Sequence, residues 1–349
     1  TGATASGNIT LVADTTIKNS GSGTLVLSGT INGAQALTIT NTGSVTLSGI
    51  VGVSTSLTSL SISGPSTLGA NITTTGTQTY SGAVTVSGSG TRTLTGTTVT
   101  NSSTLNGGAI ALTITGNASI GGAITNVTNL SISGTSTIGA NVTTTGTQTY
   151  SGAVTLSASP TLTTTANGNV TLSGTVNGAY TFTINTNGTG DTTLGDSVGG
   201  TTPLTGLTIS TDVLTTAAIK LNGTLDITNR GSSTISGILS DAVLSSSRLN
   251  LAKYGSGTLT LTGTNTYTGN TTFNAGTVRA ENTASFSTGL VSISNTTLQF
   301  AYDTSANFGN NIQLFGSSSI ITDRVTSGAG VTHTLGTLSI GAYTLTIDR

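Results

Sequence analysis

The chain has 349 residues, of which only 5% are charged and 34% are hydrophobic, and its formal net charge is -1. Nine Lys and Arg residues against ten Asp and Glu residues leave no basic stripe for phosphates, which excludes a nucleic-acid-binding protein. The absence of Cys excludes a disulfide framework and thiolate metal sites, and the low charge with ample hydrophobic residues excludes a disordered chain.

Met is also absent, so the sequence has no initiator residue. We therefore expect a processed or excised piece of a longer precursor, with any signal peptide upstream of Thr1. No run approaches the roughly 18 to 20 apolar residues of a membrane helix, so we expect no membrane span in this fragment. A chain without Cys suits a secreted protein that crosses an envelope unfolded.

The first 49 residues predict short strands cut by Gly or Asn. Alternation with a period of two, as in Leu25-Val26-Leu27, places every second side chain on one face of a strand. The strands expected here cover residues 9–12, 24–27, 36–39 and 44–47. No part of this stretch has a helical period.

Residues 57–88 and 127–158 carry nearly the same sequence, seventy positions apart. Three of the few differences exchange one aliphatic residue for another: Leu68 for Ile138, Ile72 for Val142, and Val86 for Leu156. Because a packed position tolerates a change of shape at nearly constant volume, we expect these side chains to point inward. We expect the unchanged Thr and Ser residues between them to face water.

Repeats organise the rest of the chain. Residues 106–114 and 172–184 echo earlier segments, so three units of about 70–80 residues tile most of residues 1–230, and residues 231–349 continue the array. Arg92 is the only charged residue between Lys18 and Asp191. A domain boundary near residues 185–205 is an alternative to one continuous stack with a longer loop there.

Short strands, Gly and Asn at corners, inward aliphatic residues and repeating coils together favour an all-β parallel solenoid over a sandwich or barrel. Coils of this kind take about twenty residues, so we expect fifteen to eighteen coils, each adding about 4.8 Å.

Residues 251–280 read LAKYGSGTLTLTGTNTYTGNTTFNAGTVRA. This segment resembles the autotransporter-associated β-strand repeat of passenger domains in large bacterial surface proteins. The matching features are Lys253, residues 255–263, Asn265, residues 267–269, Thr272 and residues 276–278, while Asn270 and Phe273 depart from the pattern. The resemblance implies a right-handed parallel β-helix displayed outside a bacterial cell, in adhesion, surface coating or filament formation, without catalytic residues.

Candidate chemistry is sparse. The single His333 lies in an alternating stretch, where we expect a solvent-facing or capping role, because no Cys and no second His can complete a dyad or metal site. Asp191 and Asp196 are the one pair considered for Ca²⁺, but no acidic partner is near in sequence. Residues 323–324 and 348–349 (Asp-Arg in both cases) predict ordinary surface charge pairs.

Two further features could bind a ligand. The Thr array at residues 73–79 resembles the Thr ladders of ice-binding solenoids, but such ladders need the same Thr spacing in every coil, and here the spacing varies. Tyr80, Tyr150 and Tyr267 could stack on sugars. We favour the alternative that each Tyr fills a corner beside its Gly.

We therefore expect an extracellular structural or adhesive surface protein with no catalytic residue, metal or cofactor. A carbohydrate-binding or carbohydrate-cleaving β-helix is the alternative. The expected partners are copies of the same chain, joined head to tail by strand contacts in which residues 338–349 are a possible donated strand. The alternative is that missing parts of the precursor cap the ends of the solenoid. A host surface or glycan is a further expected partner.

Overall fold

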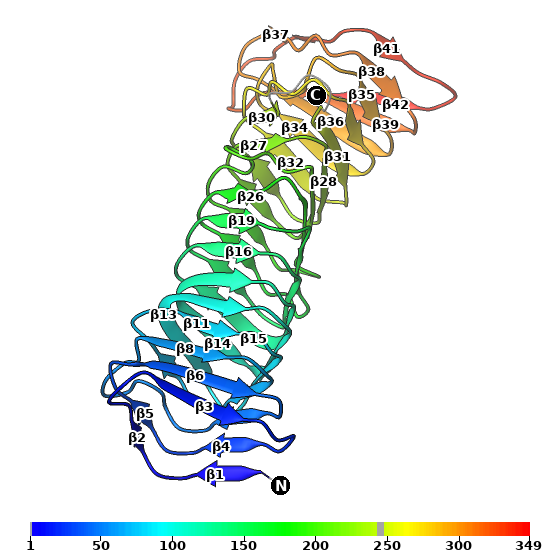
Figure 1. Cartoon of the computed structure of the whole chain (residues 1–349). Helices are drawn as coiled ribbons and strands as arrows, with labels where there is room; N and C mark the ends of the chain where they lie inside the picture. Colours follow the sequence, from blue (N-terminus) through cyan, green and yellow to red (C-terminus); the bar gives the residue numbers. More distant parts are fainter. Residues whose placement is uncertain (1, 243–247) are drawn as a thin grey trace. The chain divides into compact units, whose positions relative to one another are not determined.

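The computed structural model describes residues 2–242 and 248–349, and none of these residues lies in an α-helix. Accordingly, the described part of the chain contains no helix that could cross a membrane. The chain forms two compact units, Thr1–Thr171 and Leu172–Arg349 (Figure 1). The sequence predicts a division at residue 230 from the lengths of the repeats, whereas the two units are defined by compactness. The division at residue 230 therefore stays a prediction.

All described regular structure is β-strand. The strands of the first unit are β1 (Ala3–Ala5), β2 (Ile9–Thr10), β3 (Thr15–Asn19), β4 (Leu25–Leu27), β5 (Ile31–Asn32), β6 (Ala36–Asn41), β7 (Val45–Leu47), β8 (Ser59–Ile62), β9 (Ser66–Leu68), β10 (Ile72–Thr73), β11 (Gln78–Tyr80), β12 (Val84–Val86), β13 (Thr91–Asn101), β14 (Leu105–Ile120), β15 (Ile124–Ile132), β16 (Ser136–Ile138), β17 (Val142–Thr144), β18 (Gln148–Tyr150), β19 (Val154–Leu156) and β20 (Thr161–Thr164). β21 (Val170–Leu172) spans the division between the units.

The strands of the second unit are β22 (Val176–Asn177), β23 (Thr181–Asn185), β24 (Thr192–Leu194), β25 (Gly206–Thr211), β26 (Leu214–Thr216), β27 (Ile219–Leu221), β28 (Thr224–Asn229), β29 (Ser233–Ile235), β30 (Leu239–Asp241), β31 (Asn250–Tyr254), β32 (Thr258–Leu261), β33 (Thr271–Phe273), β34 (Gly276–Ala280), β35 (Val291–Ile293), β36 (Thr296–Ala301), β37 (Ala306–Asn307), β38 (Ile312–Leu314), β39 (Ser318–Asp323), β40 (His333–Thr334), β41 (Leu338–Ser339) and β42 (Leu345–Asp348).

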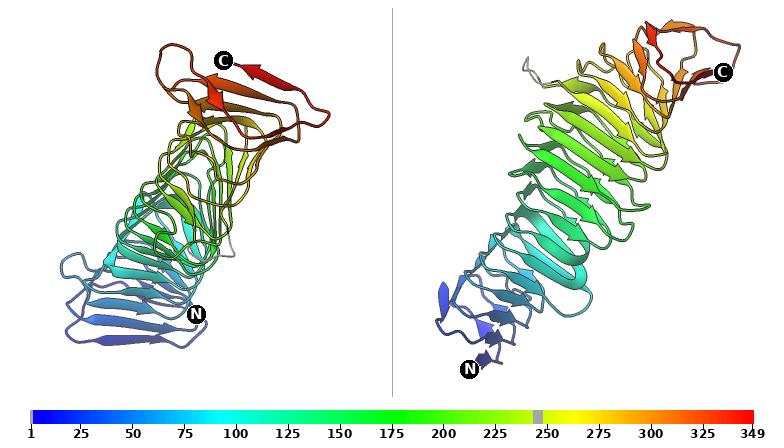
Figure 2. Two further views of the ribbon diagram at one scale, coloured as in Figure 1. Left: turned by 90° about the horizontal axis from the view of Figure 1, so that it is seen from above. Right: turned by 90° about the vertical axis from the view of Figure 1, so that its right-hand side faces the viewer.

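Each unit is a parallel β-solenoid, as the sequence predicts. In the first unit β1 pairs with β4, β2 with β5, and β3 with β6, so one coil consists of three strands on three faces. Ala3, Leu25 and Val45 are successive partners on the first face, 22 and 20 positions apart, which matches the predicted coil of about twenty residues. Figure 2 shows the strands of successive coils lying side by side within each unit.

Aliphatic ladders fill the interior of the coils. Leu27, Leu47, Leu68 and Val86 are consecutive partners on the first face of the first unit, and none is more than 3% exposed. The six residues predicted to point inward, Leu68, Ile72, Val86, Ile138, Val142 and Leu156, are all buried. This part of the prediction is confirmed.

The prediction that the unchanged Thr and Ser residues face water is wrong at four positions. Ser66, Thr74 and their counterparts Ser136 and Thr144 are at most 4% exposed. The Oγ1 of Thr74 donates to the Gly76 carbonyl at 2.9 Å, and the Oγ1 of Thr144 donates to the Gly146 carbonyl at 2.7 Å. The carbonyls of these tight turns need donors, and the hydroxyls of Thr74 and Thr144 each supply one. The buried hydroxyls of Ser66 and Ser136 have no hydrogen-bond partner among the described residues.

The two copies of the duplicated segment lie on different faces. Tyr80 pairs with Ile62, a residue of the third face, whereas Tyr150 pairs with Ile132. Ile132 belongs to the ladder of Ile114, Leu94 and Ile72, which is the second face. A repeat of seventy residues is not a whole number of three-strand coils, so the second copy is turned by one face relative to the first.

A regular ladder of hydroxyl groups covers the outside of the third face. Its eight rungs, partners in consecutive coils, are Thr16, Thr38, Ser61, Thr79, Thr100, Ser119, Thr137 and Thr155. The expectation that variable Thr spacing breaks such ladders is therefore wrong. The corners absorb the length differences between coils, so the strands stay in register.

The segment at residues 338–349 forms part of the outermost coil of the second unit. β41 pairs in parallel with β38, and β42 pairs in parallel with β39. Its role as a strand donated to another copy stays a prediction.

Replacing Ile72 or Val142 by Asp buries an unpaired carboxylate among apolar side chains, because both residues are 0% exposed. We expect a loss of several kcal/mol and unfolding of the neighbouring coils. Circular dichroism melts compare these variants with Thr85→Asp, which adds the same charge at an exposed position of β12. Melting temperatures of I72D and V142D equal to that of T85D would contradict the inward packing.

Candidate functional site

The segment 251–280 covers one full coil of the second unit and the first part of the next. β31 pairs with β33, and β32 pairs with β34. Two tight turns between these strands use left-handed glycines, Gly255 with φ 79° and Gly276 with φ 71°. A Cβ on Gly276 would lie 2.6 Å from the Gly255 carbonyl oxygen and 2.8 Å from the Lys253 Nζ, so only glycine fits this contact between coils.

Lys253 is the ionisable residue at the centre of these turns. Its side chain is 0% exposed, and its Nζ donates to the carbonyls of Tyr254 at 3.2 Å, Gly255 at 2.9 Å and Ala275 at 3.1 Å. Burial lowers the pKa of Lys253 to about 8, because the charged amine loses its hydration. The amine thus joins the turn of one coil to the turn of the next.

The three tyrosines considered for sugar stacking all lie inside the coils. Tyr80, Tyr150 and Tyr267 are at most 1% exposed, which corrects the surface alternative and confirms that they fill the interior. The Tyr80 hydroxyl donates to the Gln78 Oε1 at 2.9 Å. Tyr150 makes the same bond to Gln148 at 3.1 Å.

The Gln side chains complete this internal brace. The Nε2 of Gln78 donates to the backbone carbonyls of Ile72 at 3.2 Å and Thr95 at 2.7 Å. In the repeat segment, the Tyr267 hydroxyl bonds to the Thr271 Oγ1 at 2.6 Å. Each tyrosine therefore has a buried polar partner, as its hydroxyl requires.

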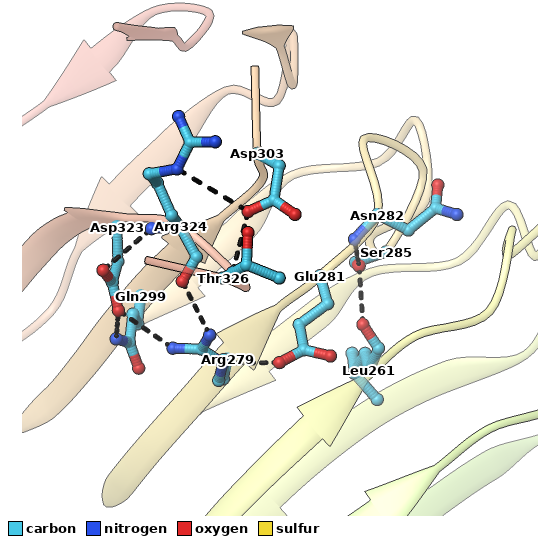
Figure 3. A network of polar contacts seen from close by, with 10 residues as sticks. All are labelled: Leu261, Arg279, Glu281, Asn282, Ser285, Gln299, Asp303, Asp323, Arg324 and Thr326. Carbon is cyan, nitrogen blue, oxygen red and sulfur yellow. Dashed lines mark hydrogen bonds and ion pairs between the residues drawn. The ribbon is translucent and has the colours of Figure 1, made fainter. Parts of the chain in front are cut away.

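A charged network lies on the outer surface of the second unit (Figure 3). The Arg279 Nε donates to the Glu281 carboxylate at 2.6 Å, and its Nη1 donates to the Asp323 Oδ2 at 3.1 Å. Gln299 donates to the same Asp323 oxygen at 2.7 Å, and the Arg279 Nη2 donates to the Arg324 carbonyl at 3.0 Å. The network joins β34, β36 and β39 across three coils.

Two carboxylates in this region, Asp323 and Asp303, are held in their charged form. The pKa of Asp323 is lowered chiefly by the backbone N–H of Arg324, and that of Asp303 chiefly by the backbone N–H of Thr326. Both carboxylates are more than 40% exposed, so their effect on stability is screened by water.

The expected charge pairs between neighbouring residues do not form as predicted. The Asp323 side chain pairs with Arg279, and the Arg324 Nε lies 3.8 Å from the Asp303 Oδ1. Asp323 is the last residue of β39, and its carboxylate already accepts bonds from Arg279, Gln299 and the backbone N–H of Arg324. Asp348 accepts the backbone N–H of Arg349 at 2.9 Å, and no ion pair between these two side chains occurs in the described residues.

His333 caps a row of interior aromatic rings. Its ring lies 5.3 Å from that of Phe308 at an angle of 78°, and its Nε2 is 3.0 Å from the Asp323 carbonyl oxygen. Phe308 continues the row to Phe300 at 4.7 Å. A cavity of about 750 Å³ lies beside His333 and is also lined by Arg324 and Asp348. The half-buried His333 therefore takes a capping position, one of the two roles predicted for it.

Asp191 and Asp196 each bind a backbone amide. The Asp191 Oδ1 accepts the N–H of Val213 at 3.1 Å, and the Asp196 Oδ1 accepts the N–H of Ser197 at 2.6 Å. Across residues 2–242 and 248–349, no three His, Asp or Glu side chains gather in a group that could hold a metal ion. Calcium, which prefers six to eight oxygen ligands, would have to draw on backbone groups here.

We expect EDTA to leave the melting temperature of the chain unchanged, because Asp191 and Asp196 already serve backbone donors. Differential scanning fluorimetry with and without EDTA checks this. A drop that excess CaCl₂ reverses, and that Asp191→Asn abolishes, would instead assign a calcium site to this loop.

We expect the unfolding free energy to rise between about pH 8 and pH 10 because of Lys253. The unfolded chain keeps this proton up to its ordinary pKa of 10.5, whereas the folded chain releases it above about 8. The unfolded state then binds more protons, and stability rises by up to about 1.4 kcal/mol per pH unit. At higher pH the buried Tyr80 and Tyr150, whose pKa burial raises, act in the opposite direction.

Urea unfolding at pH 8, 9 and 10 measures this slope. Lys253→Met, with a side chain of similar length and no charge, should flatten it, whereas Lys220→Met, at a half-buried position of β27, should leave it in place. A slope that survives in K253M would show that another group causes it.

A comparison with family models matches one segment of the chain. Residues 251–280 match the model of the passenger-associated-transport-repeat, the segment that contains Lys253, Gly255, Tyr267 and Gly276. Comparisons with curated proteins and with solved structures found no match. The repeat at residues 251–280 and the β-solenoid together fit an autotransporter passenger-like repeat protein.

Proposed function

We propose that this chain is a structural and adhesive protein of the bacterial surface, that it has no catalytic activity, and that it assembles with copies of itself. The observation that carries the proposal is the passenger-associated repeat at residues 251–280. Its strands β31 to β34 pair with one another and continue to β35 and β36, so the repeat is an integral part of the solenoid. A passenger of this kind is secreted or displayed at the surface, where a stack of hydrogen-bonded coils acts as a spacer or scaffold.

The outermost coil of the second unit offers a surface for self-association. Leu338 pairs with the buried Ile312, and Ile347 pairs with the buried Ile320, so both side chains stand in the interior register. They are nevertheless 47% and 64% exposed. A coil from another copy would cover these side chains and bond to the free edge of β42.

The first unit has a matching open strand. β1 pairs with β4, and among the described residues it has no second partner. All three of its residues, Ala3–Ala5, are exposed. Small Ala side chains opposite large Leu and Ile side chains interdigitate well, which supports head-to-tail contact between copies.

The test is to place charges on the open coil without disturbing the fold. In L338K/I347K, both exposed side chains of the interior register carry ammonium groups. At a contact between copies these groups would repel each other or lose their hydration. We expect the wild-type chain to form filaments at high concentration and this variant to stay monomeric in sedimentation velocity and electron microscopy. The matched control is Ile238→Lys, at a position that is 46% exposed and lies elsewhere in the second unit.

Deleting residues 338–349 removes β41 and β42 and should likewise abolish filaments while the remaining coils melt cooperatively. Filaments formed by the truncated chain or by L338K/I347K would refute assembly through this coil. A wild-type chain that is monomeric at every concentration would refute self-association altogether.

A further inference from the structure

One corner of the second unit carries a row of side chains from four successive coils, Tyr254, Asn274, Ser294 and Phe315. Lys253, Phe273, Ile293 and Leu314 are consecutive partners on β31, β33, β35 and β38, and each residue of the row directly follows one of them. The labelled strands β31, β35 and β38 can be followed in Figure 1. The row therefore runs along the stacking direction of the coils within this unit.

The two ends of the row are exposed aromatic rings. Tyr254 is 42% exposed and Phe315 is 53% exposed. The other phenylalanines of these coils, Phe273, Phe286, Phe300 and Phe308, are at most 6% exposed and pack against one another inside. Phe315 departs from this pattern, and a large apolar ring held in water beside polar groups indicates a binding surface.

Polar groups without protein partners lie between and beside the two rings. Thr272, Ser292 and Gln313 are partners in consecutive coils on the neighbouring outward positions. In the described chain, the side chains of Asn274, Thr272, Ser292 and Gln313 make no hydrogen bond to another protein group. The Ser294 Oγ accepts one bond, from the Asn295 Nδ2 at 3.3 Å. A groove of about 190 Å³ beside Phe315 is lined by Thr272, Phe273, Asn274, Ser292, Ile293 and Ser294.

The chemistry of this strip selects its ligand. Aromatic faces cover the apolar C–H faces of pyranose rings, and amides and hydroxyls exchange hydrogen bonds with sugar hydroxyls. None of the side chains that form the strip is charged, so it offers no ion pair to an acidic polymer. The two rings are three coils apart, roughly 14 Å at about 4.8 Å per coil, which requires several sugar units in a line.

We propose that the strip from Tyr254 to Phe315 binds a neutral linear polysaccharide lying along the stacking direction of the coils. The two rings hold sugar units at the ends of the strip, and Asn274, Ser294 and Gln313 hydrogen-bond the units between them. The strip lies on the side of the coils and does not depend on contact between copies of the chain.

Affinity electrophoresis tests this on the full chain, with laminarin, xylan, glucomannan and dextran as neutral probes and alginate as an acidic probe. We expect retardation by at least one neutral polymer and none by alginate. Tyr254→Ala and Phe315→Ala should each weaken that binding roughly tenfold, the effect expected of one lost stacking contact. Phe315→Trp should keep it, because the stacking face remains.

Tyr180→Ala is the matched control, since Tyr180 is 39% exposed and lies outside the strip. Melting curves of all variants establish that the exposed substitutions leave the fold intact. Absence of binding to every neutral polymer, binding to alginate alone, or equal affinity of Y254A, F315A and Y180A would overturn the proposal. Because the measurement uses dilute protein in its monomeric state, it is independent of the assembly proposed above.

Discussion

The backbone hydrogen bonds between successive coils are the constraint on which everything else in each unit depends. A parallel strand binds its neighbour along its whole length, so each coil must follow the course of the coil before it. Ile9, Ile31, Val51 and Ile72 form one such column. The pairing fixes which side chains share the interior, and length differences between coils are confined to the corners.

The corners then determine the interior chemistry. A tight turn directs some carbonyl groups inward, away from water, and each of these needs a donor. Asn229, which is 0% exposed, gives its Nδ2 to the carbonyls of Gly231 at 2.7 Å and Thr258 at 2.8 Å. Lys253 does the same with its amine, and Gln78 with its amide. These buried side chains donate hydrogen bonds to carbonyls of the next coil. The coils are therefore joined both by apolar packing and by bonds to the turn carbonyls.

The fold could be predicted from the sequence because its governing patterns are local. Alternation in residues 57–88, and aliphatic swaps such as Ile72 for Val142, locate the inward side chains without knowledge of their neighbours. The same alternation places Lys253 two positions after the inward Leu251, so its interior position was readable. The groups around its amine could not be predicted, because one of them, the Ala275 carbonyl, belongs to the next coil.

Contacts between residues of different coils could not be predicted from the sequence. Arg279 and Asp323 are 44 positions apart in the sequence. Their side chains meet because β34 and β39 lie two coils apart in the same stack. The hydroxyl ladder from Thr16 to Thr155 is hidden by intervals that vary from coil to coil. Where a corner absorbs one or two residues, position along the chain no longer gives position around the coil.

The rotated placement of the two copies within the first unit has a consequence for valency. Tyr80 and Tyr150 brace equivalent corners, yet they stand on the third and the second face. A seventy-residue duplication in a three-faced stack therefore does not lengthen one surface. It presents the same outward pattern, Thr79 in one copy and Thr149 in the other, in two directions. A partner that recognised this pattern would find two sites facing different ways, so the duplication favours bridging between neighbours over tighter binding of a single one.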